Sequence, residues 1–131
     1  MTNKTKVLVP PGATRGTLLF GHGSRDPLWR EPIEAVARHI QELAPAVPVR
    51  CAYLEITLPD LPTSAAELVS LGVTSITIVP MFLGVGRHAR DDLPVLLAAL
   101  QASHPHIAFE LRPAIGAEER MIQLMAKIAL S

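Results

Sequence analysis

Segments typical of β-strands alternate with amphipathic helical segments four times along this chain. Strands are predicted at residues 17–20, 47–54, 73–81 and 107–111, and the third of these is the densest in β-branched residues. Helices are predicted at residues 27–44, 59–71, 92–103 and 117–130, where apolar residues recur at helical spacing. Because short strand–helix–strand connections favour right-handed parallel crossovers, the alternation predicts an α/β fold: a doubly wound, mostly parallel four-stranded sheet with helices on both faces.

The length of 131 residues allows one compact domain, predicted at residues 17–131, after a tail at residues 1–16 that we expect to be flexible. Hydrophobic residues make up 49% of the chain and charged residues 18%, so some apolar surface is expected to be buried against a second copy. The formal net charge is zero, which argues against nucleic acid as a partner. The apolar run before Pro10 is too short for a signal sequence or a membrane span. Cys51 is the only cysteine, so no disulfide forms within the chain and a cytoplasmic location is expected.

His22 stands between two glycines directly after the first predicted strand. Asp26 and Pro27, a few residues later, are typical of a helix N-cap and the first helical residue. His22 is therefore expected on a strand-to-helix turn. In open α/β sheets such turns line the crevice at the carboxyl ends of the strands, where ligands bind.

Glu55 and His88 are predicted to share this edge of the sheet with His22. The three residues are spaced 33 apart, close to the length of one βαβ unit, and each follows one of the first three predicted strands. If the first strand lies between the second and third, as in flavodoxin-like orders, one ion could reach all three. Two imidazoles and one carboxylate suit Fe²⁺, Co²⁺, Ni²⁺ or Zn²⁺. The alternative is that each histidine is structural or solvated.

Three segments carry a resemblance to a known family: residues 18–27 (LLFGHGSRDP), 52–55 (AYLE) and 79–94 (VPMFLGVGRHARDDLP). Through them residues 17–130 resemble the sirohydrochlorin chelatases, particularly the short single-domain cobaltochelatase form (CbiX type), which is related to sirohydrochlorin ferrochelatase. The resemblance implies a chelatase-like fold and a lyase that inserts a divalent metal into sirohydrochlorin or a similar tetrapyrrole, without an organic cofactor. The metal, a substrate, would be Co²⁺ or alternatively Fe²⁺ or Ni²⁺. The resemblance also implies cobalamin or sirohaem biosynthesis, and a homodimer, since longer relatives contain two such halves.

Carried over to this sequence, the family's metal site falls on His22, Glu55 and His88, the residues that the spacing also selects. Insertion must remove two pyrrolic protons, so either histidine is expected to serve as ligand or base, and Glu55 as ligand or proton acceptor. Four further residues are candidate partners for the carboxylates of the tetrapyrrole: Ser24, Arg25, Arg87 and Arg90.

Other conspicuous residues have simpler interpretations. Asp91 and Asp92 are predicted to cap the helix at residues 92–103. Met121 and Met125 are at helical spacing and are expected in core or dimer packing. Trp29 is expected to anchor the core or an interface, with stacking on the macrocycle as the alternative. Three histidines are predicted to be solvated: His39, His104 and His106.

Two other functions are compatible with some of the same residues. A phosphohistidine-type phosphatase also begins with a strand followed by His-Gly, but it needs an arginine directly before the histidine, where this chain has Gly21. A non-catalytic carrier of metal or tetrapyrrole would use the same site without proton transfer.

Overall fold

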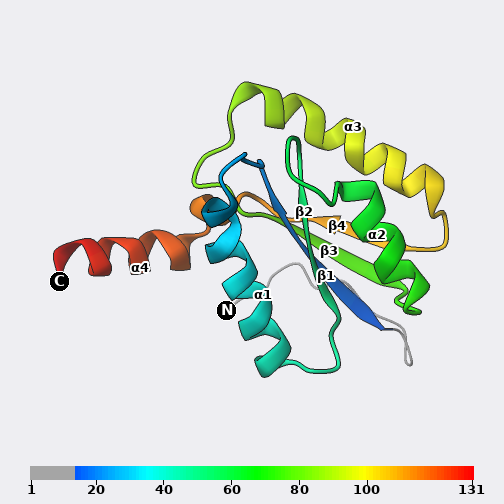
Figure 1. Ribbon diagram of the computed structural model, residues 1–131, viewed down its shortest axis with the longest axis horizontal. Coiled ribbons are helices and arrows are strands. Elements are labelled where there is room, and N and C mark those ends of the chain that lie inside the picture. Colours follow the sequence, from blue (N-terminus) through cyan, green and yellow to red (C-terminus); the bar gives the residue numbers. More distant parts are fainter. Residues whose placement is uncertain (1–13) are drawn as a thin grey trace.

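The computed structural model describes residues 14–131, in which four strands form one sheet (Figure 1). The strands are β1 (Arg15–Gly21), β2 (Val49–Tyr53), β3 (Ser75–Pro80) and β4 (Ala108–Leu111). All pairings are parallel, and the order is β2-β1-β3-β4, which is that of a flavodoxin-like sheet. The predicted α/β fold is therefore confirmed, and β1 lies between β2 and β3 as the shared site requires.

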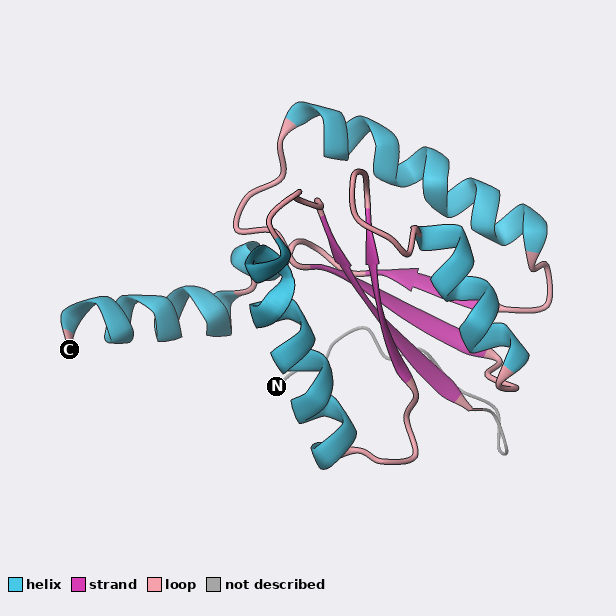
Figure 2. Ribbon diagram, in the orientation of Figure 1, coloured by secondary structure: helices cyan, strands magenta, loops and turns pink. Residues whose placement is uncertain are grey.

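Helices cover both faces of this sheet (Figure 2). The short 3₁₀ helix η1 (Pro27–Arg30) leads into α1 (Glu31–Leu43), which packs on one face, and α2 (Leu61–Ser70) and α3 (Arg87–Ser103) pack on the other. Successive strand residues point to opposite faces, so Leu18 and Phe20 meet α2 and α3 while Leu19 meets α1. After β4 come a second 3₁₀ helix, η2 (Ile115–Ala117), and α4 (Glu119–Leu130).

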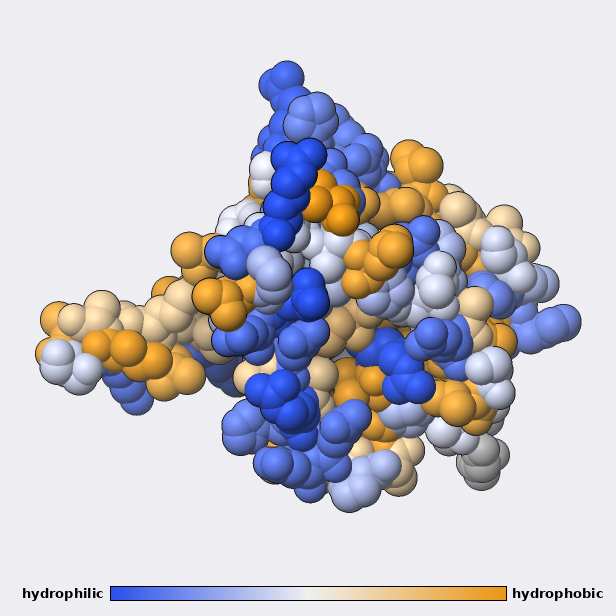
Figure 3. Space-filling view, viewed as in Figure 1, coloured by the Kyte–Doolittle hydropathy of each residue, from blue (hydrophilic) through white to orange (hydrophobic). Residues whose placement is uncertain are grey.

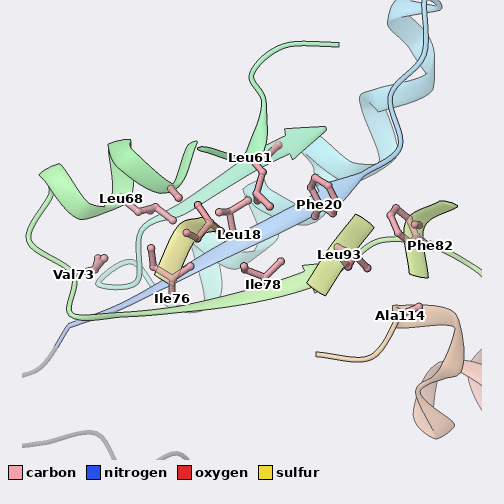
Figure 4. Packing of buried hydrophobic residues seen from close by; sticks show 14 residues of the cluster. Leu18, Phe20, Leu61, Leu68, Val73, Ile76, Ile78, Phe82, Leu93 and Ala114 are labelled. Carbon is pink, nitrogen blue, oxygen red and sulfur yellow. The ribbon is translucent and has the colours of Figure 1, made fainter. Parts of the chain in front are cut away.

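The core consists of two apolar clusters, one on each face of the sheet. The larger lies under α2 and α3 and contains the fully buried Leu18, Phe20 and Leu68 (Figure 4). It reaches the carboxyl edge of the sheet through Phe82 and Ala114, so the loops there rest on packed side chains. The smaller cluster lies under α1 and consists of Leu19, Ile33, Val49 and Tyr53. Burial of each large aliphatic side chain contributes about 1.5–3 kcal/mol, which fixes the scaffold under the edge loops.

Local signals explain several helix ends. The Asp26 carboxylate accepts a hydrogen bond from the Leu28 N–H at 2.9 Å and caps η1, as predicted. Asp60 caps α2 by accepting from the Thr63 N–H at 2.9 Å, and these contacts with Thr63 lower the pKa of the Asp60 carboxyl. Gly72 follows α2 with φ of +95°, the left-handed conformation that glycine adopts most readily after a helix.

The first predicted helix is divided in two. Pro32 has no N–H to donate to the carbonyl four residues earlier, and its ring would clash with that carbonyl inside a continuous α-helix. The chain therefore makes a 3₁₀ turn over residues 27–30 and begins α1 at Glu31, with Pro32 in the first turn, where proline is tolerated. Leu28 and Leu43, two of the apolar residues at helical spacing in the segment 27–44, are 66% and 83% exposed.

The third predicted helix begins five residues earlier than expected. Gly86 is the N-cap of α3, and the Arg90 N–H donates to its carbonyl oxygen at 3.0 Å. Asp91 and Asp92 lie inside the helix, so the prediction that they cap it is wrong. The glycines at 84 and 86 suggested a longer loop, whereas Gly86 itself starts the helix in extended conformation, with φ of −69° and ψ of 170°.

Two further expectations concern the ends of the chain. Of the predicted flexible tail, residues 1–13 lie outside the described residues, and Arg15 and Gly16 are the first residues of β1. At the other end, α4 projects away from the sheet (Figure 1), and it contains no buried residue in the described part of the chain. Met121 and Met125 are half-buried there and are not part of either core cluster. Within residues 14–131, none of the helices has the length and apolar character needed to cross a membrane.

Candidate functional site

His22 and Glu55 lie side by side at the carboxyl edge of the sheet. The Leu54 N–H donates to the Gly21 carbonyl oxygen at 2.8 Å, and the Glu55 N–H donates to the His22 carbonyl oxygen at 3.0 Å. These two backbone hydrogen bonds thus keep the segments that follow β1 and β2 in contact beyond the strand ends, and the second bond joins His22 to Glu55. Their side chains are exposed, so the sheet itself fixes where these two candidate ligands leave the backbone.

Both glycines beside His22 lie at close contacts, and at Gly23 the contact is with backbone and requires glycine. A Cβ on Gly23 would lie 1.8 Å from the Glu55 carbonyl oxygen, and the φ of Gly23 is +108°. A Cβ on Gly21 would lie 2.7 Å from Ile33 Cδ1 and 3.2 Å from the Trp29 ring. Glycine therefore lets the histidine loop press against the loop after β2 on one side and the start of α1 on the other.

Phe82 supports the His22 ring from the neighbouring strand. The two rings are stacked, with centroids 4.1 Å apart and planes 24° apart. Phe82 is buried just after β3, and its carbonyl oxygen accepts a hydrogen bond from the Gly116 N–H at 3.0 Å. The sequence alone assigns Phe82 no role. Its place after β3, beside His22 on the adjacent strand, is the signal that could have indicated one.

An open hollow of about 640 Å³ lies beside this pair of loops. Ser24 and Arg25, predicted to bind carboxylates, both line it. Arg30 also lines it and is paired with Glu34 at 3.2 Å, so part of its charge is already neutralised. The remaining lining residues come from α1 or from the loop after β2: Glu34, Ile56, Thr57 and Leu58.

His88, Arg87 and Arg90 lie elsewhere at the same edge, in the first turn of α3, and all three are exposed. The structure does not bring the predicted triad into one cluster. Across residues 14–131, no three His, Cys, Asp or Glu side chains are grouped closely enough to hold a metal ion. The ligand set with His22, Glu55 and His88 thus stays a prediction, in which the first two residues are adjacent and the third is contributed by α3.

Tyr53, at the end of β2, carries an unusual polar group. Its hydroxyl is buried and has no hydrogen-bond partner among the described residues. Burial, with the neighbouring Cys51 thiol and Glu34 carboxylate, raises the pKa of Tyr53 to about 12. Trp29 packs against it with ring centroids 5.9 Å apart, while 36% of the Trp29 surface stays exposed. Tyr53 and Trp29 thus form a mainly apolar wall under the histidine loop.

The histidines predicted to be solvated lie away from this edge. His39 is exposed on α1, with Glu42 at 3.6 Å. His104 follows the last residue of α3 and lies near the Phe109 ring, with centroids 6.3 Å apart, and His106 is exposed in the turn before β4.

Comparison with known proteins identifies the family that has this fold. The family model CbiX matches residues 16–129, which is nearly all of the described chain. The chain therefore belongs to the CbiX family, and the predicted resemblance is confirmed.

Individual relatives agree with this assignment. The chain is 37% identical over 82 residues to the sirohydrochlorin cobaltochelatase of Methanococcoides burtonii, a match that covers 63% of each protein. It is 34% identical over 91 residues to that of Methanothermobacter thermautotrophicus, covering 70% of this chain and 63% of the relative. These matches span less than two thirds of the curated relatives' own length.

Solved structures share the whole fold. A CbiX protein from Marinobacter aquaeolei VT8 superimposes with a TM-score of 0.75 at 31% identity, covering 88% of this chain and 93% of that one. The sirohydrochlorin chelatase SirB from Bacillus subtilis subspecies spizizenii, in complex with cobalt, gives a TM-score of 0.73 at 27% identity. That match covers 88% of this chain and only 51% of SirB, so SirB contains about as much chain again.

Proposed function

We propose that this chain is a metal chelatase, a lyase that inserts a divalent metal into sirohydrochlorin or a similar tetrapyrrole, with Co²⁺ as the first candidate metal and Fe²⁺ or Ni²⁺ as alternatives. The observation that carries the proposal is that His22 and Glu55 lie side by side, joined by a backbone hydrogen bond just past the ends of β1 and β2. Membership of the CbiX family and the cobaltochelatase relatives support it. The pathway would be that of cobalamin or of sirohaem.

The chemistry assigned to these residues follows from what insertion requires. Two protons must leave the pyrrolic nitrogens while the metal exchanges protein ligands for nitrogens of the macrocycle. His22 and His88 can each bind a metal or accept a proton, and Glu55 can do either as a carboxylate. A site formed by two adjacent ligands and one from a separate helix would hold the metal loosely, and a metal substrate has to be released.

The carboxylates of the macrocycle would be bound by groups that surround this edge. Ser24 and Arg25 line the open hollow, and a guanidinium can pair with a carboxylate through two hydrogen bonds. Arg87 and Arg90 lie in the first turn of α3, where the helix N-terminus also favours negative charge. These four residues would orient the substrate, and none of them would take part in proton transfer.

A homodimer is part of the proposal, with α4 in the interface. Four large apolar side chains of α4 are 44–88% exposed: Ile122, Leu124, Ile128 and Leu130. Apolar surface is visible over this helix (Figure 3). A second copy is the occupant that the comparisons favour, because SirB carries about one further length of this chain in a single polypeptide. The segment before α4 also contacts the candidate site. The Gly116 N–H of η2 donates a hydrogen bond to the Phe82 carbonyl oxygen, and the Phe82 ring stacks on the His22 ring.

The phosphatase alternative is disfavoured by packing as well as by sequence. An arginine directly before His22 would have to replace Gly21, where even a Cβ would lie 2.7 Å from Ile33 Cδ1. A non-catalytic carrier of metal or tetrapyrrole remains the alternative that the experiment must distinguish.

The test is an absorbance assay of the purified protein with sirohydrochlorin and Co²⁺, Fe²⁺ or Ni²⁺ separately, against the uncatalysed rate. We expect acceleration with at least one metal, lost on His22→Ala and retained on His39→Ala, the matched control on the exposed side of α1. Macrocycle binding without acceleration by any metal would instead establish a carrier. For the dimer, light scattering should show Ile128→Lys as a monomer and Gln123→Lys, on the same helix, as a dimer; a monomeric unsubstituted protein would contradict the homodimer.

A further inference from the structure

The Thr57 hydroxyl joins the loop that carries Glu55 to the loop that carries His22. It accepts a hydrogen bond from the Ser24 N–H at 2.9 Å and donates one to the Ser24 carbonyl oxygen at 2.8 Å. One side chain thus satisfies both backbone polar groups of a residue that is 33 positions away in the sequence. Thr57 is only 8% exposed, so water competes poorly for these bonds.

This contact continues the register of the two backbone hydrogen bonds before it. Residue 21 is paired with 54 and residue 22 with 55 through the backbone, and residue 24 is paired with 57 through the hydroxyl. The Thr57 hydroxyl therefore extends the contact between the two loops beyond their last backbone hydrogen bond. His22 and Glu55 each lie two residues before a member of this last pair.

The loop after β2 has a backbone that needs such a restraint. The Thr57 N–H donates to the Glu55 carbonyl oxygen at 2.6 Å, and the residue between them, Ile56, has φ of +69°. This is a γ-turn with positive φ, a strained conformation for a β-branched residue. The same Glu55 carbonyl lies so close to Gly23 that no side chain fits between the loops. Without the Thr57 hydroxyl, the Ile56 turn could relax and move Glu55.

We propose that Thr57 is a positioning residue of the site: its hydroxyl fixes Glu55 relative to His22 and holds Ser24 at the wall of the hollow. The activity part of this inference rests on the proposed function. The Ser24 hydroxyl extends the same network, because it accepts from the Asp26 N–H at 3.1 Å, and Asp26 in turn caps η1. The position of Thr57 therefore links both candidate ligands to the start of α1.

A matched control is available in Ser64. This residue is also buried, and its hydroxyl donates to the Cys51 carbonyl oxygen at 2.9 Å. That bond joins α2 to the middle of β2 and touches neither edge loop. Ser64→Ala therefore removes a buried hydroxyl of the same kind and should affect stability alone.

The experiment compares Thr57→Val, Thr57→Ser and Ser64→Ala in the full chain. Valine keeps the shape of threonine and leaves the Ser24 N–H and carbonyl unpaired, and serine restores both bonds. The readouts are Tm, the kcat and KM of metal insertion, the affinity for Co²⁺ alone by calorimetry, and amide hydrogen exchange at Ser24. For Thr57→Val we expect kcat and Co²⁺ affinity to fall about tenfold or more, because small displacements of paired functional groups cost that much. Thr57→Ser should stay within about twofold of the unsubstituted protein.

The outcomes separate a positioning role from a structural one. Ser64→Ala should lower Tm while leaving kcat and Co²⁺ affinity unchanged at a temperature where the protein is folded. The proposal is overturned if folded Thr57→Val keeps both values, or if Ser64→Ala lowers them as much as Thr57→Val does. If the unsubstituted protein inserts no metal, the proposed function fails, whereas Co²⁺ affinity and Ser24 exchange still test the positioning by Thr57.

Discussion

Removing the hydroxyl of Tyr53 should stabilise the protein. This hydroxyl is buried near the Cys51 thiol and the Glu34 carboxylate, and it has no hydrogen-bond partner within the described residues. A buried hydroxyl without a partner costs about 1–3 kcal/mol, because its hydrogen bonds to water are lost on folding and not replaced. Tyr53→Phe removes that cost and keeps the ring in place.

The expected gain is smaller than the full cost, since the missing oxygen leaves a small gap in the packing. We expect Tyr53→Phe to raise the free energy of unfolding by about 1 kcal/mol and Tm by about 2–5 °C for a domain of this size. Tyr53→Ala is the contrasting variant. It deletes the ring from the smaller core cluster and should destabilise the protein by about 3–5 kcal/mol.

Urea unfolding followed by circular dichroism measures both changes, and the fluorescence of Trp29 gives a second probe. Trp29 is the only tryptophan, and its ring lies 5.9 Å from that of Tyr53. The two probes should give the same midpoint if unfolding is two-state. A loss of stability of about 1 kcal/mol or more in Tyr53→Phe would mean that the hydroxyl makes a favourable bond, and the reasoning would then be refuted.

Three further predictions follow from local features. Tyr53 is the only tyrosine, so near-ultraviolet absorbance should show its ionisation near pH 12. Between pH 10 and 12 the folded state keeps a proton that the unfolded state loses, so the free energy of unfolding should fall by up to about 2 kcal/mol over this range. A free energy of unfolding that does not change with pH there would contradict the raised pKa. Gly23→Ala should lower the free energy of unfolding measured in urea by about 2–4 kcal/mol, because Gly23 has a positive φ and the Glu55 carbonyl oxygen would lie 1.8 Å from the new Cβ. Gly84→Ala, whose new Cβ would meet no atom within 4 Å, should lower it by less than about 0.5 kcal/mol. Equal effects of the two substitutions would be inconsistent with the contact at Gly23. Asp60→Ala should lower the free energy of unfolding by about 0.5–1 kcal/mol at neutral pH. Because hydrogen bonds from Thr63 lower the pKa of Asp60, the stabilisation by its carboxylate is present above about pH 4 and is lost as pH falls further. The stability of the variant should therefore fall less steeply with acid than that of the unsubstituted protein, and an identical pH dependence would argue against the cap.

The fold was predictable because the features that define it are local. The β-branched run at residues 73–81 and the alternation of strands with helices predicted a parallel sheet, and the short connections restricted its topology. Residues with one conformational role also marked helix ends: Asp26 caps η1, as predicted, and Gly72 adopts positive φ shortly after α2. Each of these signals depends on a few neighbouring residues and on nothing distant.

The errors arose where one local signal competed with another. Pro32 divides the first predicted helix, although the apolar spacing runs through it. Gly86 begins α3, although glycines usually indicate a loop. Thr57 and Phe82 have no local sequence pattern that predicts their roles, which depend on contacts with residues 33 and 60 positions away in the sequence. For Phe82 only the strand order could have indicated a position beside His22. Long-range contacts of this kind produce no repeating pattern of residues in the sequence.

The candidate site depends on both kinds of signal. The equal spacing of His22, Glu55 and His88 therefore predicts the positions of the first two residues better than that of the third. Strand adjacency dictates that residues following β1 and β2 meet, so the sequence could predict that His22 and Glu55 lie together, and the backbone hydrogen bond between them shows it. For His88 the spacing predicts only the edge of the sheet, because residues 81–86 connect β3 to α3 and the start of α3 sets the final position. On the proposed function, this division separates two tasks. The paired strands would hold two ligands at a fixed distance, and the exposed first turn of α3 would supply the third from a separate element, which suits a metal that must be bound and then released.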